Sequence, residues 1–339
     1  MPAVVHSPEQ IDFDTPGKRH YQVAFHHDSS WGYSLVPVTV IRGARTTAEP
    51  PGIAVFGGTH GNEWEGQVAV KRLCCDLDPA VIRGLVILIP QLSESACAAN
   101  QRVSPLDDVN MNRAFPGDPR GTISRRIADF VKREIFPRVG IVVDLHSGGL
   151  EGGFALCTSL HPVPDRKQRE EMIEAAKLFD TPFVFLYSSA MASGLLSDEA
   201  ESEGKITLGG EFGFGEGVSR RGVRHAYEGV RNLLLRYGFM DGTIMKVDSG
   251  RMTEPRIVSA VNLEDYVPCP RSGIWESHVD LGQDVCEGDL IGYLHDFADH
   301  SAEPLEICAP RSGVVIMMHA PAVSSKGVTL FTIAQDNEI

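Results

Sequence analysis

The chain has 339 residues, 42% of them hydrophobic and 22% charged, which is ordinary for a globular protein with a full core. A net charge of −14 argues against nucleic acid and against anionic membrane surfaces, since both attract a basic face. No segment approaches the roughly 20 uninterrupted apolar residues of a membrane span. The length predicts two domains. Because the N-terminus lacks the pattern of a signal peptide, we expect a cytoplasmic protein.

Seven cysteines are present and none forms a C-x-x-C pair. An odd number in a long chain without a secretion signal predicts reduced, mostly packed thiols. The adjacent Cys74 and Cys75 lie in a helical pattern, and both are expected to fill the core.

The first 48 residues are predicted to form an antiparallel lead-in hairpin. Residues 21–25 and 34–41 alternate apolar and polar side chains, as strands with one buried face do. Pro37 cannot donate a ladder hydrogen bond, so it favours an edge position for the second strand.

Residues 49–243 carry the pattern of an α/β domain. Short apolar runs, typical of strands buried on both faces, alternate with helical segments. The expected strands are residues 53–56, 85–90, 140–145, 183–187 and 205–208, and the expected helices are residues 64–77, 122–136, 166–179 and 224–237. This alternation predicts a mixed, largely parallel sheet flanked by helices.

Residues 244–339 are predicted to form a β-rich domain with an internal repeat. Pro270-Arg-Ser-Gly-Ile274 recurs as Pro310-Arg-Ser-Gly-Val314, and each copy leads through a turn to a second apolar strand. Two such hairpins can interleave into a flattened barrel, which resembles the barrel-sandwich fold of biotinyl and lipoyl carrier domains. A carrier needs a lysine at its hairpin tip, and residues 315–320 contain none. A structural or lid-forming role is therefore expected.

A glycine-rich turn after the first apolar run places His60 and Glu63 three residues apart. Such turns lie at the carboxyl end of a sheet, where open α/β folds build their sites. If the helix begins within the turn, the two residues share a helical face. An imidazole and a carboxylate are ligands that zinc prefers, and a catalytic zinc site needs three protein ligands plus water. The simpler alternative is a polar loop histidine beside a first-turn acid stabilised by the helix dipole.

The third ligand is expected at the end of another buried strand, where Asp144-Leu-His146-Ser-Gly-Gly follows an apolar run. His146 would emerge at the same sheet edge as the first pair. Asp144 lies two residues earlier on the same strand face and could orient a histidine through its ring N–H. Alone, His146 could equally be a buried histidine held by a carbonyl.

A polar loop between these motifs, residues 107–117, contains Asn112 and Arg113. The planar guanidinium of an arginine binds a carboxylate through two parallel hydrogen bonds, so Arg113 is a candidate to hold a substrate carboxylate, with Asn112 beside it. The alternative is a surface arginine paired with Asp107 or Asp108.

The motifs His60-Gly-Asn-Glu63, Asn112-Arg113-Ala-Phe-Pro-Gly and Asp144-Leu-His146-Ser, in this order, resemble the succinylglutamate desuccinylase/aspartoacylase family, which is related to the zinc carboxypeptidases. The resemblance covers roughly residues 50–245. It implies a zinc-carboxypeptidase-like fold, one Zn²⁺ per chain held by the two histidines and Glu63, and hydrolysis of a linear amide bond. It also implies a catalytic glutamate at a late, glycine-flanked strand end.

Glu211 matches that place, and the role is assigned to it rather than to Glu216, because Glu211 directly follows the predicted strand. Amide hydrolysis needs a base that takes a proton from water and returns it to the leaving amine. Arg102 is a further catalytic candidate, as a donor to the oxyanion or to a second substrate anion. Otherwise Arg102 only braces its loop.

The expected substrate is a small N-acyl amino acid. Few cations surround the predicted site, and the motifs resemble the branch that deacetylates N-acetyl-2,4-diaminobutyrate. Such a substrate carries one carboxylate, which Arg113 would bind, and one ammonium, which Glu216 or Glu151 could bind. Neither the acyl group nor the oligomeric state follows from the sequence, although a homo-oligomer is possible.

Three other functions compete with this hypothesis. A metallocarboxypeptidase acting on peptides would use the same metal ligands but needs more room above the metal. A non-catalytic binding module would rest on the β-rich domain. A dinucleotide site at Gly213-Phe-Gly215-Glu-Gly217 fails the G-x-G-x-x-G spacing, since Val218 occupies the third glycine position.

Overall fold

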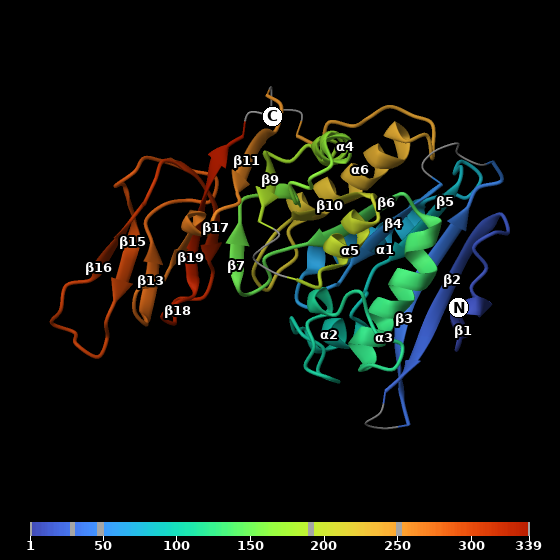
Figure 1. Cartoon of the computed structure of the whole chain (residues 1–339), viewed down its shortest axis with the longest axis horizontal. Helices are drawn as coiled ribbons and strands as arrows, with labels where there is room; N and C mark the ends of the chain where they lie inside the picture. The colour runs from blue at the N-terminus through green and yellow to red at the C-terminus, as the bar shows by residue number, and fades with distance from the viewer. Residues whose placement is uncertain (1, 28–30, 46–50, 189–192, 249–252, 338–339) are drawn as a thin grey trace.

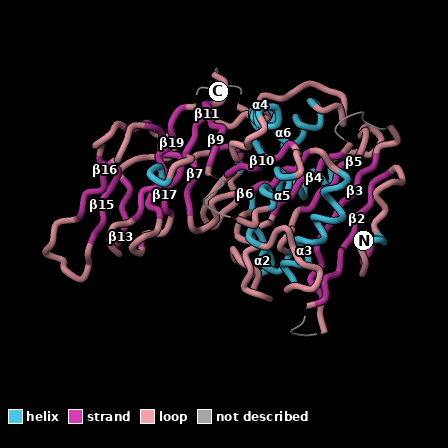
Figure 2. The backbone as a smooth tube through the Cα atoms, viewed as in Figure 1, coloured by secondary structure: helices cyan, strands magenta, loops and turns pink. Residues whose placement is uncertain are grey.

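The computed structural model describes residues 2–27, 31–45, 51–188, 193–248 and 253–337. Its largest unit is a sheet of 15 strands, in which a central path runs in the order β1-β2-β3-β5-β4-β6-β10-β8-β9-β11-β19-β17-β14. Helices gather around one half of this sheet, and the remaining strands extend away from them (Figures 1 and 2). No helix of the described ranges is long and apolar enough to cross a membrane.

The N-terminal and central strands form the first half of the sheet. Their bounds are β1 Ala3–Val5, β2 Gly17–His26, β3 Tyr33–Arg42, β4 Gly52–Gly57, β5 Leu85–Ile89, β6 Ile141–His146, β8 Cys157–Leu160, β9 Phe183–Tyr187 and β10 Ile206–Glu211. Strands β5, β4, β6 and β10 are parallel neighbours, while β2, β3 and β8 introduce antiparallel pairs. The predicted mixed, largely parallel sheet is confirmed.

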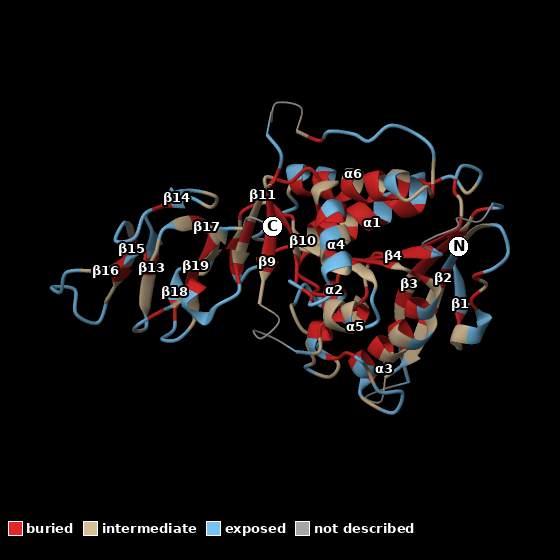
Figure 3. Cartoon of the chain, turned by 45° about the horizontal axis from the view of Figure 1, so that its top comes forward, coloured by how far each residue is buried: buried red, intermediate tan, exposed pale blue. Residues whose placement is uncertain are grey.

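The helices cover both faces of this half. They are α1 Trp64–Asp76, α2 Glu94–Ala99, α3 Ile123–Phe130, α4 Arg166–Lys177, α5 Leu196–Ser202 and α6 Arg220–Arg236. Helices α1, α4 and α6 pack on one face in one apolar cluster, and α3 and α5 pack on the other face in a second cluster. Figure 3 shows the buried residues along β4 and on the inward sides of the helices.

Two expectations about single residues in this half need correction. Strand β3 is internal, because it pairs with β2 and with β5. The β5 pairing covers only Thr39–Arg42, so Pro37 lies beyond it and has only β2 as a neighbour, with Gln22 opposite. Cys74 is buried as expected but Cys75 is exposed, since consecutive helical residues point about 100° apart. All seven cysteines are free.

The C-terminal strands confirm the interleaved hairpins. Their bounds are β11 Arg256–Ala260, β12 Tyr266–Pro268, β13 Gly273–Ser277, β14 Asp284–Val285, β15 Leu290–His295, β16 Leu305–Cys308, β17 Gly313–His319, β18 Val323–Ser324 and β19 Thr329–Asp336. Strands β16, β15, β13 and β18 form a separate four-stranded sheet. Between the hairpin strands, β14 crosses to pair with β17 and β18 crosses to pair with β13. The two sheets share one apolar cluster that includes Trp275 and Phe331.

The C-terminal strands also continue the main sheet. Strand β11 pairs in parallel with β9 and antiparallel with β19, and the short strand β7, Gly152–Phe154, pairs with β17. The backbone next to the predicted site is thus hydrogen-bonded to the C-terminal half. The domain limits 1–48, 49–243 and 244–339 stay predictions, and the boundary at 48/49 lies outside the described residues.

Gly66, in the first turn of α1, allows the helix to pack directly on β6. A Cβ there would lie 2.4 Å from the Leu145 carbonyl oxygen. Helix propensity alone makes alanine about 1 kcal/mol better than glycine in a helix. Overpacking against rigid backbone typically costs about 1–3 kcal/mol, so we expect Gly66→Ala to lower the free energy of unfolding. Urea denaturation followed by circular dichroism measures the change.

Gly217→Ala is the control, because no atom lies within 4 Å of a Cβ built at Gly217. It should leave the denaturation midpoint nearly unchanged. Equal stability of the two variants would show that the contact between α1 and β6 tolerates a methyl group.

Candidate active site

Three predicted ligands, His60, Glu63 and His146, meet at the carboxyl edge of β4 and β6. Strands β4 and β6 are parallel neighbours with Gly57 opposite Leu145, so the residues that follow them emerge side by side. The expectation that His60 and Glu63 share a helical face is wrong. Helix α1 begins at Trp64 with Glu63 as its N-cap, and the turn before the helix brings the two side chains together.

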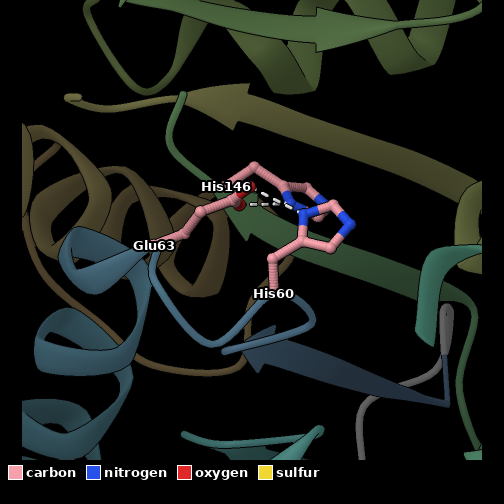
Figure 4. Close-up of side chains that lie close together, drawn as sticks. All are labelled: His60, Glu63 and His146. Atoms are coloured by element: carbon pink, nitrogen blue, oxygen red, sulfur yellow. Dashed lines mark hydrogen bonds and ion pairs between the residues drawn. The ribbon is translucent and has the colours of Figure 1, made fainter. Parts of the chain in front are cut away.

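The carboxylate of Glu63 faces both imidazoles (Figure 4). Its Oε1 is 2.7 Å from Nδ1 of His60, and its Oε2 is 2.8 Å from Nδ1 of His146. Each residue offers one ligand atom, and these atoms lie within 4.8 Å of one another. Both imidazoles therefore present the same nitrogen, Nδ1, to a common point.

The outer nitrogens of both histidines have acceptors. Nε2 of His60 lies 3.0 Å from Oδ1 of Asn110, and Nε2 of His146 lies 2.8 Å from Oδ2 of Asp144. A proton on Nε2 leaves the Nδ1 lone pair free for a metal. The predicted role of Asp144 in orienting a histidine is thus confirmed by its contact, and Thr59 fixes Asp144 with a 2.6 Å hydrogen bond.

The charges of the cluster fit a cation. Burial would raise the pKa of Glu63, but the two histidines hold it well below the usual range, so the carboxylate is ionised. Burial lowers the pKa of His60, which favours the neutral imidazole that a metal requires. Burial opposes protonation of His146, whereas Asp144 and Glu63 raise its pKa well above the usual range. Two imidazoles and one carboxylate are a ligand set of catalytic metal sites.

Two further donors hold the Glu63 carboxylate. Arg102 donates from Nη1 to Oε1 at 2.9 Å, and the backbone N–H of Ser147 donates to Oε2 at 3.2 Å. The guanidinium of Arg102 lines the cavity above the cluster. Sequence reasoning expected Arg102 near the site but did not foresee its contact with a ligand.

Glu211 is the last residue of β10 and lies directly opposite His146 in the parallel pair. Opposite residues in a sheet point to the same side, so both side chains face the cavity. Oε2 of Glu211 is buried and has no hydrogen-bond partner within the described ranges. Burial, followed by the negative charge of Glu63, raises the pKa of Glu211 to about 8. A cation at the cluster would lower this pKa and keep the carboxylate available as a base.

Asn112 and Arg113 also line the cavity, as expected for substrate-binding residues. The Asn112 side chain accepts a 2.9 Å hydrogen bond from the Leu196 N–H and lies 3.4 Å from Nε2 of His146. Arg113 is exposed, and its Nη1 donates to the Asn112 carbonyl. Asp107 binds Ser124 instead, so the alternative pairing of Arg113 with Asp107 is not found.

The cavity has a volume of about 430 Å³ and extends from the ligand cluster along the sheet to α5. Its walls come from both halves of the chain. The C-terminal half contributes Tyr266, Met317, Thr329 and Thr332. The C-terminal strands therefore close one side of the cavity, which restricts the molecules that can enter.

The loop at Gly213–Gly217 does not bind a dinucleotide phosphate. Helix α6 begins at Arg220, and the Ser219 N–H at its N-terminus donates to the Glu65 carboxylate at 2.7 Å. This carboxylate occupies the position that a phosphate would take. It also accepts a 2.5 Å hydrogen bond from the Ser147 hydroxyl, so the loop is tied to the strand that carries His146.

The two acids expected to meet a substrate ammonium lie differently. Glu151 lines the cavity and accepts a 3.4 Å hydrogen bond from Asn62. Glu216 is exposed and is not among the residues that line the cavity. The sequence reasoning missed Glu201, which lines the far end. Nothing in the local pattern distinguishes it from Glu199 and Glu203 in the same acidic segment.

The site and fold match known proteins. A sequence model of the succinylglutamate desuccinylase/aspartoacylase catalytic domain matches residues 49–237. The chain therefore belongs to the succinylglutamate desuccinylase/aspartoacylase family. Both names in that description are of enzymes that remove an acyl group, so the family supports a hydrolase acting on amide bonds.

Particular relatives cover nearly the whole chain. N-alpha-acetyl-L-2,4-diaminobutyric acid deacetylase from Halomonas elongata is 32% identical over 329 residues, 96% of this chain and 94% of the relative. A succinylglutamate desuccinylase/aspartoacylase structure from Rhodobacter sphaeroides is 30% identical with a TM-score of 0.90, covering 97% and 98% of the two chains. The product-bound ectoine utilization protein EutE (DoeB) from Ruegeria pomeroyi is 29% identical with a TM-score of 0.88, covering 96% and 98%.

Asp144→Asn tests the metal site. The amide keeps the shape of the carboxylate but offers one acceptor oxygen to the two donors, His146 and Thr59. Loss of a hydrogen-bond acceptor that orients a metal-binding histidine typically lowers metal affinity about 10–100-fold. Competition with a chelator, followed by elemental analysis, measures the affinity. Glu151→Gln changes a cavity carboxylate that contacts neither histidine, and it should retain wild-type affinity. Equal affinity in both variants would contradict the role of Asp144.

Proposed function

We propose that this chain is a zinc-dependent amidohydrolase that removes a short acyl group from an N-acyl amino acid. The substrate we expect is N-acetyl-L-2,4-diaminobutyrate. One observation carries the proposal: two Nδ1 atoms and the Glu63 carboxylate meet in a cavity of about 430 Å³ that Glu211 also lines, and Oε2 of Glu211 is buried without a partner among the described residues. The name of the Halomonas relative supports the choice of substrate.

His60, Glu63 and His146 would hold one zinc ion per chain. A zinc ion in such a site polarises the amide carbonyl and lowers the pKa of bound water to about 7. The chain supplies the remaining groups. Glu211 takes the proton from water and returns it to the leaving nitrogen, for which it needs a free oxygen aimed at the cavity.

Arg113 and Asn112 would bind the substrate carboxylate. The guanidinium of Arg113 has four N–H donors beyond the one that Asn112 accepts. Asn112 already accepts from the Leu196 N–H, so its amide N–H groups are the atoms that remain for a carboxylate oxygen. Arg102 uses one N–H on Glu63 and could direct others at the oxyanion that forms on the attacked carbonyl.

A carboxypeptidase activity on peptides is the second enzyme hypothesis, and the wall that the C-terminal strands add to the cavity speaks against it. A binding module on the C-terminal strands is the non-enzyme hypothesis, and the strands that would form it serve as a wall of the cavity instead. A cytoplasmic location and a homo-oligomer stay predictions.

A substrate panel tests the proposed reaction. Zinc-loaded protein should release acetate from N-acetyl-L-2,4-diaminobutyrate and should not release C-terminal residues from unstructured peptides, because the C-terminal strands limit the room at the metal. Mass spectrometry of the products measures both. Elemental analysis should give about one zinc per chain, and chelation should abolish turnover until zinc is restored.

Two outcomes would reject the proposal. Undiminished hydrolysis by metal-free protein would exclude zinc dependence. Peptide trimming at a rate equal to or above deacetylation would favour the carboxypeptidase.

Glu211→Gln separates catalysis from metal binding. The amide keeps the size of the side chain but cannot accept a proton, so kcat should fall about 10²–10⁴-fold while zinc content and KM change little. His60→Ala removes a ligand and should lower zinc content itself. Stopped assays and elemental analysis of the same samples distinguish the two effects.

Glu216→Gln is the matched control, because Glu216 is an exposed glutamate five residues further along, outside the cavity. It should retain wild-type kcat. Loss of zinc in Glu211→Gln, or near-normal kcat, would remove Glu211 from the mechanism.

A further inference from the structure

The end of the cavity farthest from the metal ligands carries a second buried carboxylate, that of Glu201 on α5. Its side chain is only 8% exposed. Oε2 of Glu201 accepts a 2.8 Å hydrogen bond from Nδ1 of His161, while Oε1 has no partner within the described ranges. Ser159, Tyr187 and Ser197 line the same end and add three hydroxyl groups.

The free oxygen of Glu201 needs a donor. A buried carboxylate oxygen without a hydrogen bond loses its contacts with water, and no protein donor replaces them. Burial accordingly raises the pKa of Glu201, because the charged carboxylate is less stable away from water. A cationic group bound in the cavity would remove this penalty, because it supplies both a donor and a positive charge.

An organic ammonium fits this end better than a metal ion does. The ligand atoms of His161, Asp198 and Glu201 lie within 4.8 Å of one another, as those of the first cluster do. However, Nε2 of His161 is buried without a partner, whereas Nε2 of His60 and of His146 each has an acceptor. A histidine that binds a metal through Nδ1 needs such an acceptor for its other N–H. Nδ1 of His161 instead lies 2.8 Å from Oε2 of Glu201, which leaves Oε1 for another donor.

A primary ammonium has three N–H donors. Glu201 Oε1 can accept one, and Ser159, Tyr187 and Ser197, which line the same cavity, can accept others. Arg113 lies near Asp198 and Tyr187, but it forms no ion pair with Glu201 in the described part of the chain, and its Nη1 donates to the Asn112 carbonyl.

The spacing between Ser159 and Glu211 along β10 suits a short side chain. Ser159 lies opposite Gly209 in the pair of β8 with β10, and Glu211 follows two residues later on the same face of β10. Two residues of a strand span about 7 Å. Gly209, between Glu211 and Ser159 along this face, also lines the cavity.

We propose that Glu201 is a specificity-determining residue that binds the side-chain ammonium of the substrate, with the hydroxyl groups of Ser159, Tyr187 and Ser197 around it. The substrate class is then an N-acyl amino acid with a primary ammonium on a short side chain. This inference rests on the proposed function for the position of the amide, but the ammonium subsite can be tested without turnover.

The test compares two ligands that differ only at the ammonium. L-2,4-Diaminobutyrate and L-norvaline have side chains of equal length, with an ammonium in the first and a methyl group in the second. Isothermal titration calorimetry with zinc-loaded wild-type protein should show about 10–100-fold tighter binding of diaminobutyrate, the range of a hydrogen bond to a charged group. Glu201→Gln should abolish this preference and leave norvaline binding unchanged, because the glutamine keeps an acceptor for His161.

Glu199→Gln is the matched control on the same helix. Glu199 pairs with Lys132 and does not line the cavity, so the variant should keep the wild-type preference. The N-acetylated forms of the two ligands give the corresponding ratio of kcat/KM, which should fall by the same factor in Glu201→Gln only.

Three results would overturn the inference: no preference for diaminobutyrate in the wild type, an equal loss of affinity for both ligands in Glu201→Gln, or a second metal ion per chain that this variant loses. The wild-type comparison needs no variant, so it decides even if Glu201→Gln does not fold. A further combination separates the two proposals. In it, the wild type prefers diaminobutyrate and Glu201→Gln removes the preference, but neither N-acetyl compound is hydrolysed. That result would support the ammonium subsite and reject the proposed function.

Discussion

The position of one ionised carboxylate, that of Glu63, determines the rest of the site. It touches both imidazoles, receives Arg102 and the Ser147 N–H, and lies at the N-terminus of α1, where the helix dipole favours negative charge. Its neighbours come from a turn after β4, a loop after β5 and the end of β6. Such a carboxylate can be buried because two donors and a cation site beside the two imidazoles balance its charge, and the parallel register of β4 and β6 sets the distance between the imidazoles.

Close backbone packing maintains this geometry. Glycine at position 66 lets α1 approach β6, and glycine at position 213 makes room for the Glu65 carboxylate, which a Cβ there would meet at 2.3 Å. Glu65 in turn joins Ser147 to the start of α6. The two acidic residues Glu63 and Glu65 thus have different roles. Glu63 faces the cavity, whereas Glu65 binds Ser147 and the start of α6.

The C-terminal strands extend the same sheet and give the cavity its second wall. The pairing of β7 with β17 joins the loop after His146 to the C-terminal half, and Met317 and Thr332 face the space above the ligands. A repeat that resembles a carrier domain in sequence is used here to limit access. Under the proposed function, the walls of the cavity would limit the size of the substrate, and the charged groups that line it would select among small substrates.

The sequence by itself determined the strands of the central sheet, most helices and the set of candidate ligands, because these depend on local periodicity and on polar residues at strand ends. The start of α1 at Trp64, the exposure of Cys75 and the internal place of β3 were not predicted, since each depends on which neighbour packs against the element. Only the tertiary structure brought Glu201, Ser159 and Tyr187 together, from a short helix and the two neighbouring parallel strands β8 and β9. Three glutamates of α5 and its end, at positions 199, 201 and 203, look alike in the sequence. The face that α5 presents to the sheet makes one of them a buried group of the cavity and leaves the other two paired with Lys132.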